Sequence, residues 1–69
     1  MKPNAEQSQR EFSYTVACKR MMNDCALMQD QVDTAKRAAT NGQSYGAMLN
    51  VEYALENLRI AIINALKTV

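Results

Sequence analysis

Two cysteines and a few carboxylates are the residues of this chain whose types and spacing could do chemistry. Cys18 and Cys25 stand seven positions apart, and the chain has no histidine. Catalysis by a serine or cysteine nucleophile needs a neighbouring base, usually histidine, and zinc sites need grouped Cys and His residues. On one helix, this spacing puts the two Cα atoms about 10 Å apart, too far for a disulfide. We therefore predict that both cysteines are small core residues, and we expect no metal and no cofactor.

The carboxylates and the glycines do not form a recognisable catalytic or nucleotide site either. Asp33 and Glu56 each have an arginine at helical spacing, Arg37 and Arg59, which is typical of solvated ion pairs on a helix surface. Phosphate-binding loops need several glycines followed by Lys and Ser or Thr. The segment 40–46 holds both glycines of the chain but no lysine. We expect this protein not to be an enzyme.

Length and charge narrow the remaining classes. A chain of 69 residues is at most one domain, and it lies in the range where one apolar core rarely suffices without oligomerisation. Its 8 Lys and Arg are interspersed with 7 Asp and Glu, so electrostatics do not favour nucleic-acid binding. The apolar run 60–63 is too short to span a membrane. We expect a soluble, cytoplasmic protein.

The first predicted element is a long helix over residues 8–39. Ser8 and Glu11 fit the capping-box pattern, in which each side chain satisfies a free backbone N–H group of the other residue. Asn4 offers an overlapping candidate start. Residues 1–7 are expected to be partly disordered.

The second predicted element is a helix over residues 44–67, separated from the first by a turn over 40–46. Ser44 is a suitable N-cap, and Lys67 lies at the negative end of the helix dipole. Gly42 favours a left-handed stop of the first helix. The predicted fold class is all-α, an antiparallel two-helix hairpin in a single domain over residues 1–69.

Both helices carry apolar residues at alternating spacings of four and three, the pattern of a heptad seam. The seam positions are Tyr14, Cys18, Met21, Cys25, Met28, Val32, Ala35 and Ala39 in the first helix, and Met48, Val51, Leu55, Leu58, Ile62, Ala65 and Val69 in the second. Folded back antiparallel, they form layers whose residue numbers sum to 86 or 87, such as Met28 with Leu58. The methionines could instead form an adaptable binding surface. Their seam positions favour core packing.

A second apolar stripe, separate from the seam, indicates that a second copy of the chain completes the core. The stripe lies about 120° from the seam at about 100° per residue, so one hairpin cannot cover it. We predict a homodimer that forms a four-helix bundle. The predicted dimer interface comprises Met22, Leu49, Tyr53, Ile60 and Ile63. The alternative is that these are scattered surface residues.

A further set of residues escapes the core assignment and forms a candidate partner-binding surface. Exposed aromatic and aliphatic groups beside arginines are typical of the residues that dominate protein recognition. An alternative for Phe12 and Tyr14 is that they contact the second subunit. The candidates are Arg10, Phe12, Tyr14, Val16, Arg20, Leu27 and Tyr45.

The whole chain resembles the small phage-encoded anti-quorum-sensing proteins. The resemblance is carried by the length of 69 residues and by three segments, REFSYTVACKRMMNDCALMQDQVDTAKRAAT, NGQSYG and MLNVEYALENLRIAIINALK. It implies an inhibitor in the host bacterial cytoplasm that binds a LuxR-type quorum-sensing activator and the type IV pilus assembly ATPase. Blocking the pilus motor would exclude superinfecting phages. No motif assigns these partners to particular residues.

Two other functions stay open on the sequence. One is an oligomeric sponge that sequesters cyclic nucleotide signals of host defence, which needs basic and aromatic groups between subunits, such as Lys19 or Arg20 with Tyr14. The other is an RNA-binding hairpin dimer, which needs a basic stripe along one face. The interspersed acidic residues argue against the second.

Overall fold

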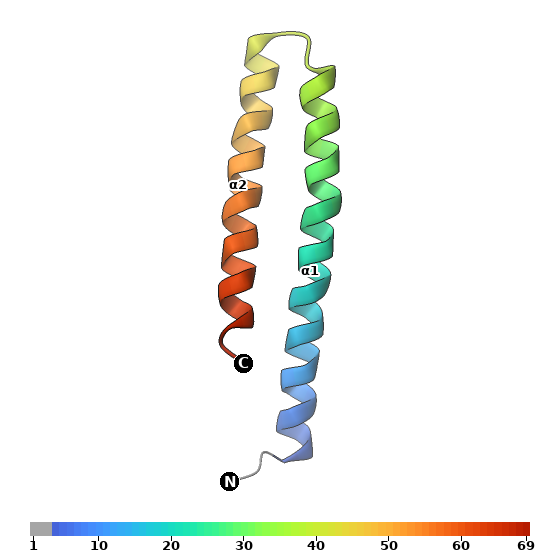
Figure 1. The fold of residues 1–69 in the computed structure, drawn as a ribbon, viewed down its shortest axis with the longest axis vertical. Helices are drawn as coiled ribbons and strands as arrows, with labels where there is room; N and C mark the ends of the chain where they lie inside the picture. Colours follow the sequence, from blue (N-terminus) through green and yellow to red (C-terminus); the bar gives the residue numbers. More distant parts are fainter. Residues whose placement is uncertain (1–3) are drawn as a thin grey trace.

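Two antiparallel helices make up the structure, a computed structural model that describes residues 4–69. Helix α1 spans Ala5–Ala38 and helix α2 spans Gly42–Leu66. The two helices lie side by side, with the start of α1 and the end of α2 at the same end of the molecule and the start of α1 extending beyond the end of α2 (Figure 1). The predicted all-α hairpin is confirmed.

The start of α1 is set by an asparagine cap. The Asn4 side chain accepts a hydrogen bond of 2.7 Å from the backbone N–H of Gln7, and this satisfies one of the free donors of the first turn. The helix therefore begins at Ala5, and the predicted start at Ser8 is wrong, while the overlapping candidate Asn4 is confirmed. The expected disorder of residues 1–3 lies outside the described residues.

A second asparagine cap starts α2 and makes the turn shorter than predicted. The Asn41 side chain accepts a hydrogen bond of 2.8 Å from the backbone N–H of Ser44, so Ser44 lies inside the helix and is not its cap. Ala39 has an extended backbone with φ of −65° and ψ of 129°. The left-handed stop predicted at Gly42 is wrong, because this glycine already belongs to α2. The connection is residues 39–41.

The buried core is one line of residues along the contact between the helices. Its members recur at intervals of seven residues, which keeps them on the facing side of each helix. Both cysteines belong to it as free thiols, as the sequence predicts. The core consists of Cys18, Cys25 and Val32 from α1 and Leu55 and Ile62 from α2.

The register of the helices differs from the predicted layers. The residue numbers of three cross-helix contacts sum to 79, 81 and 81, where the predicted layers sum to 86 or 87. The cause is the short connection, which centres the hairpin on residue 40, whereas the predicted turn over 40–46 centres it on residue 43. The three contacts are Tyr14 with Ala65, Gln29 with Glu52 and Lys36 with Tyr45. The long side chains of Lys36 and Glu52 also meet, along a diagonal whose residue numbers sum to 88.

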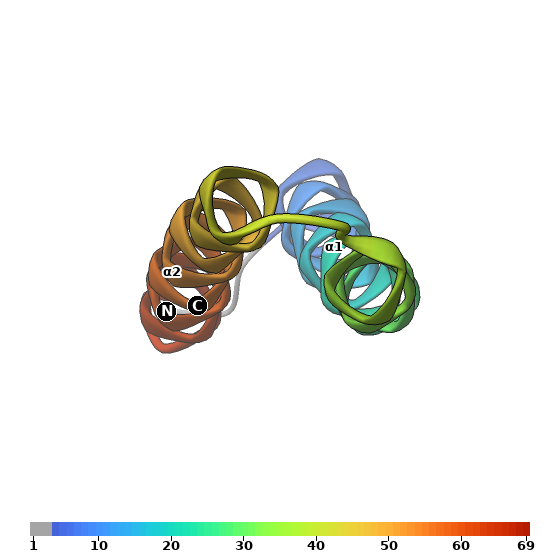
Figure 2. The same ribbon diagram turned by 90° about the horizontal axis from the view of Figure 1, so that it is seen from above.

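The hairpin is a rod with extents of 59 × 15 × 10 Å. Its radius of gyration is 17.0 Å, whereas a compact chain of this length has a radius of about 11 Å. Seen along its length, the molecule is a single layer of two helices that cross at an angle (Figure 2). Neither helix, over the residues described, is long and apolar enough to cross a membrane.

Candidate protein-interaction surfaces

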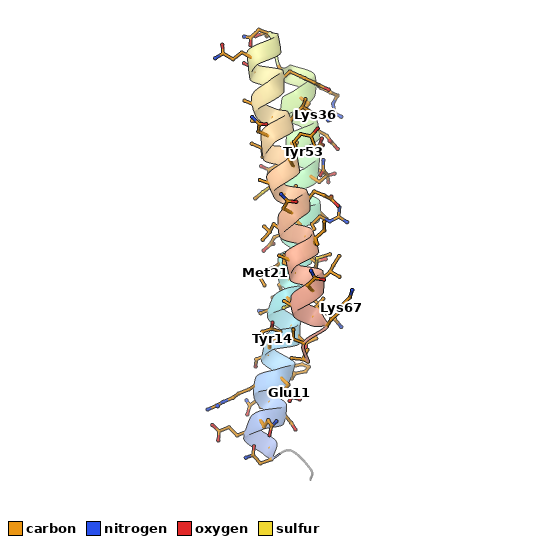
Figure 3. All side chains as sticks on the ribbon, turned by 90° about the vertical axis from the view of Figure 1, so that its left-hand side faces the viewer. Glu11, Tyr14, Met21, Lys36, Tyr53 and Lys67 are labelled. Atoms are coloured by element: carbon orange, nitrogen blue, oxygen red, sulfur yellow. The ribbon has the colours of Figure 1, made fainter. Side chains whose placement is uncertain are left out.

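The two broad faces of the hairpin, on either side of the core line, differ in chemistry. We call one the apolar face; it presents Tyr14, Met21 and Met28 of α1 and Val51 and Leu58 of α2, all exposed. We call the other the polar face; it presents Gln29 and Lys36 of α1 and Glu52 and Arg59 of α2, all partly buried. Figure 3 shows Met21 and Lys36 on opposite edges of the molecule.

The apolar face corrects the predicted seam. Met21 and Met28 are 43% and 49% exposed, and Leu58 is 49% exposed, although all three were predicted to lie in the core. Hydrogen bonds join the helices on the polar face, so the partly buried flank is the polar one. Two helices alone bury only one line of contact. The seam residues on the side of that line away from the polar face, among them Met21, Met28 and Leu58, stay uncovered.

A shallow groove of about 190 Å³ runs between the helices on the apolar face. Met21, Met28 and Leu58 form its rim, and core residues form its floor. At the end near the chain termini, the Tyr14 hydroxyl donates a 3.3 Å hydrogen bond to the carbonyl oxygen of Ala65. This bond fastens the end of α2 to α1, and it explains why Tyr14 is only partly available for a partner.

The polar face is centred on Glu52. Its carboxylate accepts a 2.9 Å hydrogen bond from the Gln29 side-chain amide, and the Lys36 ammonium lies 3.3 Å from it. The hydrogen bond to Glu52 raises the pKa of Lys36 above its ordinary value. The same ammonium lies 5.9 Å from the centre of the Tyr45 ring, within range of a cation–π interaction. These contacts hold the helices together near the turn, so the charges of Lys36 and Glu52 have a structural role.

The predicted dimer stripe divides between two environments. Met22 packs against the buried core from the polar-face side, so it contributes to the hairpin itself. Leu49 is partly buried. Tyr53, Ile60 and Ile63 are exposed, and Tyr53 lies on the side of α2 that faces away from α1 (Figure 3). Their role in a dimer stays a prediction.

The predicted partner-binding residues are spread along the rod and do not gather in one site. Phe12 and Leu27 are 69% and 62% exposed, and Val16 is partly buried. Phe12 lines an open cavity of about 440 Å³ with Leu66 and Val69 at the end of α2. The remaining members, all exposed, are Arg10, Tyr14, Arg20 and Tyr45. Arg10 pairs with Glu6, and Tyr45 lies beside the turn.

Sequence reasoning missed the Glu52 cluster. Gln29, Lys36 and Glu52 each lie three or four residues from a core position of their helix, and Gln29 faces Glu52 only in the observed register. A turn placed at residues 39–41 would have paired them. The cluster also contains a lysine–tyrosine pair that the sequence did not predict, Lys36 with Tyr45. The pairing of Lys19 or Arg20 with Tyr14 was expected between subunits and stays a prediction.

We interpret these surfaces from their own chemistry, because comparison with known proteins gave no match. Within residues 4–69, no group of three or more His, Cys, Asp or Glu side chains is placed to hold a metal ion. No protein-family model, curated protein or solved structure matches this chain. The hairpin presents apolar contact surface on three sides: the apolar face, the outer side of α2 and the outer side of α1.

Proposed function

We propose that this protein is a non-enzymatic phage inhibitor that binds and blocks host proteins. The observation that carries the proposal is the exposure of large apolar side chains on rigid helices, since Phe12 is 69%, Leu27 62% and Tyr53 66% exposed. Aromatic side chains such as those of Phe12 and Tyr53 are enriched among the residues that dominate protein–protein binding. The resemblance to phage anti-quorum-sensing proteins supplies the partners, a LuxR-type quorum-sensing activator and the type IV pilus assembly ATPase.

The proposed mechanism is occlusion. A helix that lays its apolar side chains into a groove of another protein covers that groove for any other ligand. Bound to the activator, the inhibitor prevents transcriptional activation. Bound to the pilus motor, it stops pilus extension and protects the infected cell from other pilus-dependent phages. In this proposal the active form is a homodimer in the host cytoplasm.

Binding to the two purified host proteins tests the proposal. Isothermal titration of the full-length chain into the activator and into the ATPase should give saturable binding to each. Aromatic anchors typically contribute about 2 kcal/mol or more, so Phe12→Ser should weaken at least one affinity by roughly 30-fold. Gln9→Ser, an exposed polar change on the same helix, is the matched control and should bind as the wild type does.

Three results would contradict parts of the proposal. Failure of the wild-type chain to bind either host protein would refute the function. Unchanged binding by Phe12→Ser and by Leu27→Ser would refute the contact residues. Micromolar or tighter binding of cyclic di- or trinucleotides in the same instrument, without binding to the host proteins, would favour the cyclic-nucleotide sponge.

A further inference from the structure

The apolar face continues beyond its large residues into a rim of alanines. Each alanine lies one helical step further from the core line than the large residues of its helix. On α2 the alanines recur every seven residues, whereas on α1 Asp24 and Gln31 occupy the positions between Ala17 and Ala38. Small side chains let two helices approach closely, because the distance between helix axes depends on the side chains at the contact. The exposed alanines of the rim are Ala17 and Ala38 of α1 and Ala47, Ala54 and Ala61 of α2.

The area exposed by the hairpin matches what a dimer buries. Its accessible surface is 5512 Å², whereas a compact monomer of 7.7 kDa exposes about 4,300 Å². The excess of about 1,200 Å² exceeds the roughly 800 Å² that each partner contributes to a stable interface of standard size. Five buried residues form the whole described core, so additional burial would stabilise the fold.

We infer that the apolar face is the dimer interface, with a second copy of the chain seated on it to form a four-helix bundle. The inference rests on the dimerisation included in the proposed function and gives it a location. Met21, Met28 and Leu58 become the centre of the bundle, and the alanine rim lets the second hairpin approach. The polar face and the outer side of α2 stay on the surface.

A second copy fits this face better than a single helix of another protein. The face consists of two apolar rows. With the alanines included, the row from Tyr14 to Ala38 is about 36 Å long and the row from Ala47 to Ala61 about 21 Å long, at 1.5 Å per residue. A covering molecule must present two rows of about these lengths with large residues at the centre and small ones at the rim. The chain itself supplies this pattern. Asp24 is the one acidic residue lining the groove, and it lies at the rim.

The inference differs from the sequence prediction, and one pair of substitutions separates the two. Leu58 on the apolar face and Ile60 on the outer side of α2 are both 49% exposed. They lie two residues apart on the same helix, and glutamate differs little in helix propensity from either residue. Leu58→Glu places a charge in the proposed interface, whereas Ile60→Glu leaves it in solvent.

Light scattering on the full-length chain at micromolar concentrations measures the outcome. The wild type and Ile60→Glu should have a mass of about 15.4 kDa, twice the 7.7 kDa of one chain. Leu58→Glu should raise the dimer dissociation constant by about 30-fold or more. Far-UV circular dichroism checks that both variants keep their helices. Should Leu58→Glu lose its helices, a photo-crosslinking amino acid at position 58 of the otherwise unchanged chain should capture a second copy, and one at position 60 should not.

Each alternative result has a distinct meaning. A dimer that survives Leu58→Glu and is lost in Ile60→Glu overturns the inference and supports the predicted stripe. A monomeric wild-type chain overturns the inference and the dimer of the proposed function together. Binding to the activator and the ATPase is measured separately, so the inference can fail while host-protein binding stands.

Discussion

Leu55→Ala probes whether one line of side chains holds the two helices together. Leu55 is buried at the centre of α2 and belongs to the five-residue core. Replacing a buried leucine by alanine typically costs about 2.7–5.0 kcal/mol of unfolding free energy, through lost transfer energy and the cavity left behind. Leu55 also lines the open groove on the apolar face, where neighbouring side chains can move into the space. We therefore expect a loss near the lower end, about 3 kcal/mol.

Thermal unfolding followed by circular dichroism measures this loss. For a domain of 60–100 residues, 1 kcal/mol shifts the melting temperature by about 4–8 °C, so Leu55→Ala should lower it by roughly 12–24 °C. Unfolding of a dimer depends on concentration, and all variants must be compared at the same protein concentration. Leu27→Ala is the control, because Leu27 is exposed on the outer side of α1 and its loss should change stability by less than about 0.5 kcal/mol.

Equal shifts for the two leucine variants would refute this reasoning. A loss below about 1 kcal/mol for Leu55→Ala would do the same, because it would mean that the observed core line contributes little. Either result would indicate that the helices pack on different faces from those described.

Three further predictions concern the turn and its neighbourhood. Asn41→Ala removes the cap of α2 and should lower the free energy of unfolding by about 1 kcal/mol, measured by urea denaturation. An unchanged free energy of unfolding would show that the cap does not stabilise α2. Gly46→Ala should raise stability by about 0.5–1 kcal/mol in the same assay, because Gly46 lies within α2 and an added Cβ meets nothing within 4 Å in the described structure. The raised pKa of Lys36 predicts a pH dependence: its contribution is complete below the ordinary value of 10.5 and is lost as pH rises through the higher pKa of the folded chain. Melting temperatures between pH 9 and 12 should therefore decline less steeply for Lys36→Met than for the wild type, whereas the exposed control Lys19→Met should follow the wild type.

The fold class and the cysteine environment could be predicted from the sequence because they depend on local patterns. Heptad spacing fixes helix formation, and the lack of histidine leaves Cys18 and Cys25 as core residues. The turn was harder to place. Gly42 and Gly46 read as breakers, but Asn41 satisfies the free donors of the next helix, and with that cap the glycines are tolerated inside its first turns.

The candidate surfaces were predicted less well, because predicting them requires the correct position of the turn. An error of three residues in the centre of the turn shifts every cross-helix pair, so the contact of Gln29 with Glu52 could not be found. One row of the predicted seam on each helix forms the buried core, but periodicity does not tell which flank of the seam faces the partner helix and which faces solvent. Met21 and Leu58 lie on the flank that a second layer must cover.

The three-residue connection also sets how many residues of chain separate the two partners of each cross-helix contact. Lys36 and Glu52, near the turn, are 16 positions apart, whereas Tyr14 and Ala65, near the chain ends, are 51 positions apart. Closing a longer loop costs more conformational entropy, so we expect contacts near the connection to form before those near the termini. On this expectation the end of the rod that carries Phe12 closes last and opens first, and it keeps the greatest freedom to adapt its shape to another molecule.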